Sequence, residues 1–114
     1  MPKRGEVWAV NLDPAVGDEI KKTRPVVVVG SDFIKGLENK IVVPIREWHD
    51  YFGKLYWMIK INPSKSNGLE KESAADANQI KSISIKRFEK KVGRLADSTL
   101  DDIVAAVALC IEYE

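Results

Sequence analysis

The stretch Pro25-Val26-Val27-Val28-Val29-Gly30 decides the fold of this 114-residue chain. The run is too short for a helix and consists mostly of β-branched residues, which favour strands. A run without alternating polar residues is typical of a strand that is shielded on both of its faces. We therefore expect this strand to lie at the centre of the core, with the other elements arranged around it.

Further strands are predicted by short runs of β-branched and aromatic residues that end at turn-forming pairs. The stronger candidates are Glu6–Leu12, Ile41–Ile45 and Leu55–Ile61, and the weaker ones are Gln79–Ile85 and Val92–Leu95. Pro44 cannot donate a ladder hydrogen bond, so we expect an edge, a bulge or a strand end at this residue.

The segments between these strands are predicted to be mostly irregular. Polar and turn-forming residues indicate loops over 13–24, Arg46–Gly53 and Ser64–Asp76, and Lys86–Glu89 is expected to form a single helical turn.

The C-terminal segment predicts the one long helix. Its apolar residues follow the i, i+3, i+4 spacing of a single buried face, with Ser98 expected as the N-cap: Leu100, Ile103, Val104, Val107, Ala108 and Ile111. Strands first and a helix last predict one α+β domain over residues 1–114, with a small, strongly bent, barrel-like sheet closed by the helix.

Composition limits the possible functions. The chain is 45% hydrophobic and 31% charged, with a net charge of +1, so any nucleic-acid site must be a local patch. The single Cys110 lies in the helical stretch and fits a packing role in a reducing compartment. Because neither an export signal nor a bilayer-length apolar segment is present, we expect a cytoplasmic protein that does not contact a membrane.

The motifs of nucleotide-cofactor and zinc enzymes are missing from the sequence, so we expect neither a cofactor nor a metal. His49 is the only histidine, which excludes acid–base chemistry by two imidazoles.

Two arginines stand at the ends of predicted strands. Arg24 precedes the valine run, where its guanidinium can bind a phosphate through two hydrogen bonds or form a structural ion pair with Glu19 or Glu6. Arg46 follows the next strand, and Trp48 and Tyr51 nearby could stack on a base or form part of the core.

A dense basic stretch runs from Lys81 to Arg94. It can attract phosphate, or it can be a solvated face that offsets the acidic residues Asp97, Asp101 and Asp102. The sequence leaves both interpretations open.

Taken together, three ordered blocks of sequence resemble the N-terminal signature of the MazF/PemK (Kid-like) toxins of type II toxin–antitoxin systems. The blocks are Arg4–Trp8, Asn11–Glu19 and Thr23–Val29, and further likenesses occur at Ile41–Ile45, Asn67–Leu69 and Asn78–Ile83. The resemblance implies an SH3-like barrel of the CcdB/PemK type and a homodimer. It also implies a cofactor-free endoribonuclease that cuts single-stranded mRNA and is inhibited by a cognate antitoxin.

The resemblance also implies roles for individual residues. Arg24 matches the active-site arginine that precedes proline in these toxins, and Glu19 matches a loop glutamate that serves here as the candidate base. Gln79, Lys81, Asn78 and Trp48 are then expected to hold RNA.

Three positions depart from the family pattern. Arg46 stands where many members have threonine or serine, Ile20 where glutamine is common, and Asn78 where aspartate or glutamate is usual. Arg46 is therefore expected to act as a second phosphate clamp, because an arginine normally cannot accept a proton.

These departures also favour an alternative, a non-catalytic toxin similar to CcdB that binds and poisons a protein target. A generic SH3-like interaction module is the third possibility, and the near full-length resemblance argues against it.

Overall fold

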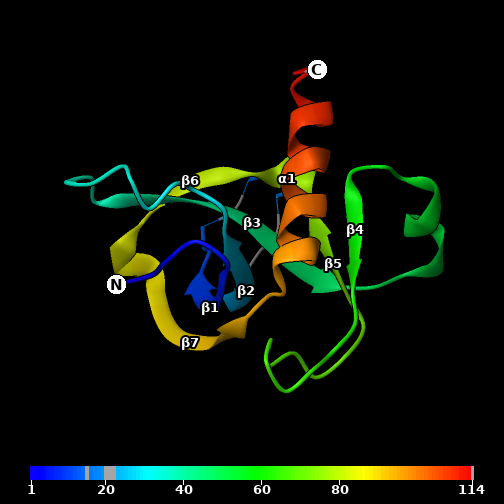
Figure 1. The fold of residues 1–114 in the computed structure, drawn as a ribbon, viewed down its shortest axis with the longest axis horizontal. Coiled ribbons are helices and arrows are strands. Elements are labelled where there is room, and N and C mark those ends of the chain that lie inside the picture. The colour runs from blue at the N-terminus through cyan, green and yellow to red at the C-terminus, as the bar shows by residue number, and fades with distance from the viewer. Residues whose placement is uncertain (15, 20–22, 114) are drawn as a thin grey trace.

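Seven strands and one α-helix follow one another in the computed structural model, which describes residues 1–14, 16–19 and 23–113 (Figure 1). The strands are β1 (Glu6–Asn11), β2 (Thr23–Val28), β3 (Asn39–Glu47), β4 (Met58–Ile61), β5 (Ser73–Asp76), β6 (Lys81–Ser84) and β7 (Phe88–Arg94). The helix α1 covers Asp97–Cys110, and short 3₁₀ turns lie at η1 (Asp50–Lys54), η2 (Ala77–Gln79) and η3 (Ile85–Arg87).

All strand pairs are antiparallel, and the strands follow the order β4-β5-β3-β2-β1-β7, with β6 joined to β3. The predicted α+β class, with a bent antiparallel sheet and a long helix at the C-terminus, is confirmed. Within the described residues β4 and β7 do not pair, so the sheet bends strongly without closing through its end strands.

The long strand β3 organises the sheet, because it pairs with β2 on one edge and with both β5 and β6 on the other. On the second edge the ladder stops after Val42↔Lys81 and resumes at Ile45↔Ala75, and η2 lies in the gap. Pro44 falls inside this gap, where its missing N–H leaves no ladder bond to lose. The expected irregularity at Pro44 is therefore present as a change of register.

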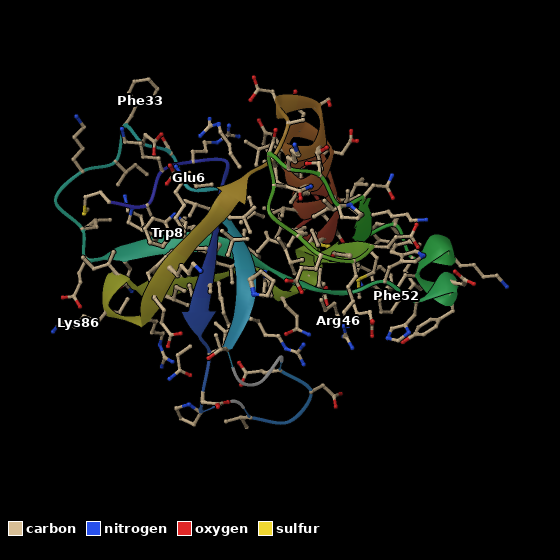
Figure 2. The ribbon with its side chains drawn as sticks, turned by 90° about the horizontal axis from the view of Figure 1, so that it is seen from below. Glu6, Trp8, Phe33, Arg46, Phe52 and Lys86 are labelled. Carbon is tan, nitrogen blue, oxygen red and sulfur yellow. The ribbon has the colours of Figure 1, made fainter. Side chains whose placement is uncertain are left out.

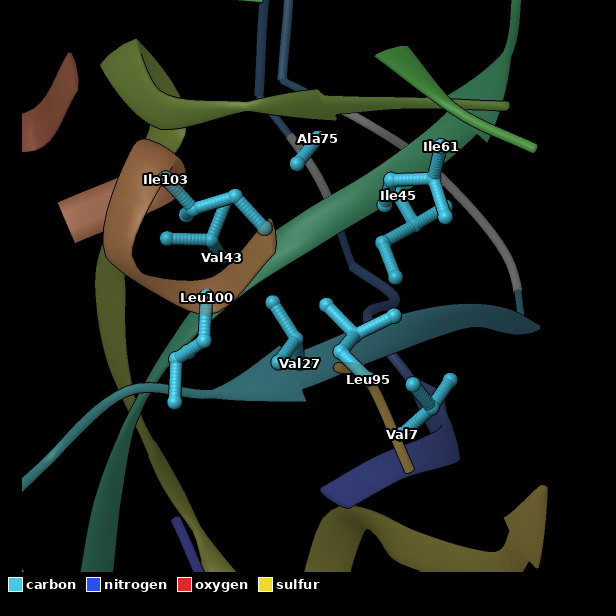
Figure 3. Packing of buried hydrophobic residues seen from close by; sticks show 9 residues of the cluster. All are labelled: Val7, Val27, Val43, Ile45, Ile61, Ala75, Leu95, Leu100 and Ile103. Atoms are coloured by element: carbon cyan, nitrogen blue, oxygen red, sulfur yellow. The ribbon is translucent and has the colours of Figure 1, made fainter. Parts of the chain in front are cut away.

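The valines of β2 point alternately to two separate apolar clusters, as expected for a strand shielded on both faces. Val27 packs with Val7, Val43 and the helix residues Leu100 and Ile103 (Figure 3). Val26 and Val28 pack on the opposite face of the strand with Val10, Leu12, Val42 and Ile83. The side chains of Val26, Val27 and Val28 are 0–1% exposed, which confirms the central place of this strand.

Several predicted boundaries were wrong. β2 begins at Thr23 and β3 extends to Glu47, so Arg24 and Arg46 lie within strands and not in flanking loops. The predicted loop Ser64–Asp76 contains β5, and the predicted strand Val92–Leu95 is part of the longer β7. The helical turn predicted at Lys86–Glu89 is present as the 3₁₀ turn η3, which begins one residue earlier and ends two residues earlier than predicted.

The helix begins one residue before the predicted N-cap. Ala96 is the N-cap and makes no side-chain cap hydrogen bond, while Ser98 lies inside the first turn. The acidic Asp97 in that turn complements the positive end of the helix dipole.

The predicted buried face of α1 is only partly correct. Leu100 and Ile103 are buried as predicted, and Val107 packs against the core while partly buried. Val104 and Ile111 are 36% and 66% exposed, so their prediction was wrong, and Ala106 is buried instead.

Two segments approach so closely that only glycine fits. Gly68 has a φ of +70°, and a Cβ at this residue would clash with the backbone carbonyl of Val92 in β7. A Cβ at Gly93 would likewise clash with the backbone of Ser66 and Asn67. The 64–68 loop is therefore packed directly on the β7 backbone. Among the described residues no helix is long and apolar enough to cross a membrane.

Candidate active site

Arg24 and Arg46 line the same pocket, which has a volume of about 320 Å³ and is called the arginine pocket here. Its walls come from β1, β2, β3, β5, β7 and the loop after β4: Ala9, Thr23, Arg24, Pro25, Ile45, Arg46, Glu47, 68–71, Ser73 and Val92. Lys71 and Glu47 form an ion pair of 3.3 Å at its rim. Two arginines thus line one cavity, and arginine suits the binding of a phosphate.

The register of the sheet explains why the two arginines come together. β2 and β3 pair as Val28↔Val42, Val27↔Val43 and Val26↔Pro44. Continued by two residues, this register sets Arg24 opposite Arg46, and residues opposite each other point to the same face. Sequence analysis placed each arginine at a strand end, and the pairing of the strands joins them.

Arg46 is held beside an aromatic cluster on η1 (Figure 2). Its guanidinium carbon lies 5.4 Å from the centre of the buried Phe52 ring. Trp48 packs edge-on against the same ring at 5.6 Å, and Lys60 Nζ lies 5.3 Å from the centre of the Trp48 ring. Trp48 is thus half-buried and engaged by neighbours, whereas Tyr51 is 62% exposed.

A second pocket, of about 440 Å³, is called the amide pocket here and brings together four more predicted site residues, Glu19, Asn78, Gln79 and Lys81, but not Trp48. It is lined by Asp18, Glu19, Asn78, Gln79, Ile80 and Lys81. Glu19 lies 3.6 Å from Lys81 Nζ and accepts a hydrogen bond of 2.7 Å from the N–H of Val16. The Gln79 amide donates to the carbonyl of Asp18 at 3.4 Å. These contacts join the β1–β2 loop to η2 and β6.

The two glutamates considered as partners of Arg24 each form an ion pair with a lysine. Glu19 pairs with Lys81, on the side of the amide pocket, and Glu6 pairs with Lys91 at 2.9 Å. Burial by itself raises the pKa of Glu6. Hydrogen bonds from Lys91, the N–H of Lys3 and the Trp8 indole outweigh burial and lower this pKa to about 2. Glu6 is therefore a structural carboxylate.

The basic stretch has partly structural roles. Arg87 donates two hydrogen bonds, of 2.9 Å to the carbonyl of Asn11 and 2.7 Å to the carbonyl of Asp13. The guanidinium thereby fixes the start of the loop that carries Glu19. Lys91 is bound to Glu6, while Lys86 and Lys90 are exposed.

Sequence analysis missed Asp76, a carboxylate that is only 3% exposed at the end of β5. Its Oδ2 accepts a hydrogen bond of 3.3 Å from Gln79, and Oδ1 has no partner among the described residues. Burial raises the pKa of Asp76, and the positive charge of Arg46 opposes that shift. The sequence feature that could have pointed to Asp76 is that it is the single acidic residue among the small residues of Ser73–Ala77.

Two residues singled out in the sequence lie outside both pockets or outside the described structure. Ile20 lies outside the described residues, and the exposed His49 lies 5.3 Å from Phe52, centre to centre, away from both pockets. Within residues 1–14, 16–19 and 23–113, no group of three or more His, Cys, Asp and Glu side chains is placed to hold a metal ion.

Comparison with known proteins identifies the family. A family described as the PemK-like, MazF-like toxins of type II toxin–antitoxin systems matches residues 3–111. The chain is 31% identical to Endoribonuclease MazF9 of Mycobacterium tuberculosis, covering 98% of each chain. It is 28% identical to Endoribonuclease EndoA of Bacillus subtilis, covering 96% of this chain and 93% of the relative.

Solved structures share the fold at lower sequence identity. MazF from Deinococcus radiodurans superposes with a TM-score of 0.82 at 15% identity, over 97% of this chain and 96% of that chain. An endoribonuclease in complex with its cognate antitoxin, from a mycobacterial species, superposes with a TM-score of 0.78 at 15% identity, over 100% and 98%. The chain thus shares its fold with these solved structures. The chain belongs to the PemK-like, MazF-like toxin family, as its sequence motifs predicted.

Proposed function

We propose that this protein is the toxin of a type II toxin–antitoxin system and acts as a metal-independent endoribonuclease on single-stranded mRNA. The observation that carries the proposal is the full-length family match combined with the two arginines that border one pocket. The relatives named as endoribonucleases cover nearly the whole chain, which supports the same activity here.

In the proposed reaction the ribose 2′-hydroxyl attacks the adjacent phosphate, leaving a 2′,3′-cyclic phosphate and a 5′-hydroxyl. The protein must remove a proton from the 2′-oxygen, stabilise the charge on the pentacoordinate phosphorus and protonate the leaving oxygen. Arg24 is assigned to the charged phosphorane, because a planar guanidinium can donate two parallel hydrogen bonds to its oxygens. Arg46 is the second clamp.

Glu19 is the candidate proton acceptor, and the amide pocket is the candidate site for the flanking bases. Asn78 and Gln79 carry amide groups that suit base edges, and Lys81 suits a phosphate. Trp48 offers a partly exposed ring for stacking.

The proposal includes three further properties: a homodimer, a cognate antitoxin as partner and a cytoplasmic location. The exposed apolar residues at the end of α1, Leu109 and Ile111, suit contact with a second copy, because an apolar surface gains by leaving water. The antitoxin complex of a structural relative supports the antitoxin as partner. Light scattering of the purified protein measures the mass of the assembly.

The test is cleavage of a long, mixed-sequence single-stranded RNA by the purified protein in excess EDTA, with the product ends mapped. We expect discrete cuts that end in cyclic phosphates. Arg24→Ala should reduce the rate by about two to three orders of magnitude, the usual cost of removing one transition-state donor. Arg94→Ala, at the end of β7 and outside both pockets, is the matched control and should cut at the wild-type rate.

Glu19→Gln tests the proton acceptor in the same assay. The variant should cut more slowly, while Glu89→Gln, at an exposed glutamate of β7 outside both pockets, should not, because only Glu19 is assigned to proton transfer. An unaltered rate in Glu19→Gln would remove Glu19 from the mechanism. If the folded wild-type protein leaves RNA intact, the ribonuclease proposal fails and a protein target becomes the better candidate.

A further inference from the structure

Among the described residues two acidic side chains are buried, and only one of them has hydrogen-bond partners for both of its oxygens. Glu6, 7% exposed, is bound by Lys91, Lys3 and Trp8. Asp76 is more deeply buried, and its Oδ1 atom has no hydrogen-bond partner among the described residues. A buried polar atom without a partner is uncommon in native proteins and calls for a reason.

The sheet register brings Asp76 to the same face as Arg46. Arg46 on β3 is opposite Ala74 on β5, and Asp76 follows Ala74 by two residues. Such diagonal neighbours on one face lie within reach of long side chains. The charge of Arg46 also acts on the Asp76 carboxyl, since it lowers the pKa of that group against the effect of burial.

Other polar groups also lie near Asp76. The backbone N–H groups of Asn78 and Gln79 lower the pKa of the Asp76 carboxyl, as Arg46 does, but carry no charge. Lys60 on β4 is opposite Ala74 as well, but its ammonium lies 3.1 Å from Glu72 and over the Trp48 ring. Cys110 on α1 is affected by Asp76, whose negative charge adds to burial in raising the pKa of the thiol. Arg46 is therefore the main cationic neighbour of the carboxylate.

The second oxygen of Asp76 points to the other pocket. Gln79 Nε2 donates to Asp76 Oδ2 at 3.3 Å and to the Asp18 carbonyl at 3.4 Å. One buried carboxylate thus neighbours the arginine of the first pocket and binds the amide of the second. Arg46 and Gln79 belong to different elements, β3 and η2. Asp76 is bound to Gln79 and is affected by the charge of Arg46.

We propose that Asp76 is a positioning residue that holds Arg46 toward the arginine pocket and Gln79 toward the loop of Glu19. The role rests on the proposed ribonuclease function, because Arg46 and Gln79 are assigned there to the phosphate and the bases. Asp76 itself does not touch RNA, since it is almost wholly buried.

Asp76→Asn tests the proposal, because the change removes the negative charge while almost keeping the shape. The turnover number kcat should fall about 10- to 100-fold, as for other residues that orient a functional group, with KM nearly unchanged. In an Arg46→Ala background the same substitution should have almost no further effect, because the group that it positions is absent. The matched control is Glu6→Gln, which alters the other buried carboxylate and should lower Tm without changing kcat.

A second readout does not depend on cleavage. The Nε–H signal of Arg46, assigned by its loss in Arg46→Lys, should show an ordered side chain in the wild-type protein and a mobile one in Asp76→Asn. If the wild-type protein does not cut RNA, the ribonuclease proposal fails, and this signal still decides the position of Arg46.

Three results would overturn the inference. The first is an unchanged kcat in Asp76→Asn. The second is a double variant whose fold loss in kcat equals the product of the losses in Asp76→Asn and Arg46→Ala. The third is an Arg46 Nε–H signal that shows an ordered side chain in Asp76→Asn. If Asp76 had only a structural role, Asp76→Asn would lower Tm, as Glu6→Gln does. The effects of Asp76→Asn and Arg46→Ala on kcat would then be independent of each other.

Discussion

At the scale of single residues, the two buried carboxylates have pKa values that are shifted in opposite directions. Desolvation disfavours the charged form in both. Three hydrogen-bond donors, one of them cationic, overcome that effect for Glu6. The donors around Asp76 do not overcome it, so the pKa of Asp76 is raised and the pKa of Glu6 is lowered.

The lowered pKa of Glu6 predicts how stability depends on pH. A carboxyl group with a pKa of about 2 in the folded state and 4.5 otherwise binds fewer protons when folded. Its contribution is therefore fully present above pH 4.5 and is lost as the pH falls toward 2. Glu6→Gln should lower the free energy of unfolding by up to about 3 kcal/mol at pH 7, and the deficit should shrink between pH 4.5 and 2.

Urea unfolding of the wild-type protein and Glu6→Gln at a series of pH values checks this prediction. The difference between the two proteins isolates Glu6 from the other acids, which titrate in both. A deficit that stays constant from pH 7 to pH 2.5 would contradict the lowered pKa.

Sequence could identify Arg24 and Arg46 as notable residues, because each stands beside a β-branched run. It could not show that they border one pocket, since that depends on the register between β2 and β3. Asp76 was missed because a lone acid in a short alanine-rich segment is usually exposed, and its burial follows from long-range pairing.

At the scale of elements, the contact between the 64–68 loop and β7 predicts a steep cost for added side-chain volume. Gly68→Ala combines a positive φ with a clash against the Val92 carbonyl. It should destabilise the fold by more than about 2 kcal/mol, because backbone strain and overpacking add. Gly53→Ala is the control: its Cβ would meet nothing within 4 Å, so its Tm should stay close to the wild-type value.

Thermal unfolding of both variants measures the effect. Because Gly68 also lines the arginine pocket, any folded fraction of Gly68→Ala should lose activity as well. Equal Tm values for the two variants would show that the loop can move away from β7.

Arg87 predicts a local effect on the β1–β2 loop. Arg87→Ala removes both hydrogen bonds to the carbonyls of Asn11 and Asp13. Hydrogen exchange should then speed up about 10-fold or more at residues 16–19, because local opening becomes easier. Lys86→Ala, an exposed neighbour, should leave exchange unchanged. Unchanged exchange in Arg87→Ala would mean that other contacts hold this loop.

Elements with strong local signals were predicted well. The valine run and the spacing of α1 depend on side chains within one segment. The strand β5 was missed because Ser-Ala-Ala-Asp has little β propensity, and its pairing with β3 and β4 decides its conformation. The helix start shifted because Asp97 and Ser98 both suit a first turn, and the cap position depends on the chain that leads into it.

At the scale of the whole molecule, the two apolar clusters lie on opposite faces of the same strands. This arrangement predicts that residues 1–114 unfold as one domain. Ile103→Ala in the first cluster and Val26→Ala in the second should each lower stability, by about 2–5 and about 1–3 kcal/mol respectively, without splitting the transition. Denaturation followed by both tryptophan fluorescence and circular dichroism checks it, and two separate midpoints would contradict it.

The class of fold could be predicted from sequence because the order of strands and helix restricts the possible arrangements. The sequence could not show that the sheet stays open, nor that η2 separates β5 from β6. Both features arise where distant segments meet, and one of them depends on Pro44, whose effect on the ladder appears only once β3 has partners on both edges.

The bond pattern of Arg87 bears on how this protein can diversify. The guanidinium donates to the carbonyl oxygens of residues 11 and 13, which every amino acid supplies. The loop residues after 13 can therefore change while both bonds persist. The sequence of the neighbouring loop can thus change, in evolution or by engineering, while Arg87 keeps its start attached.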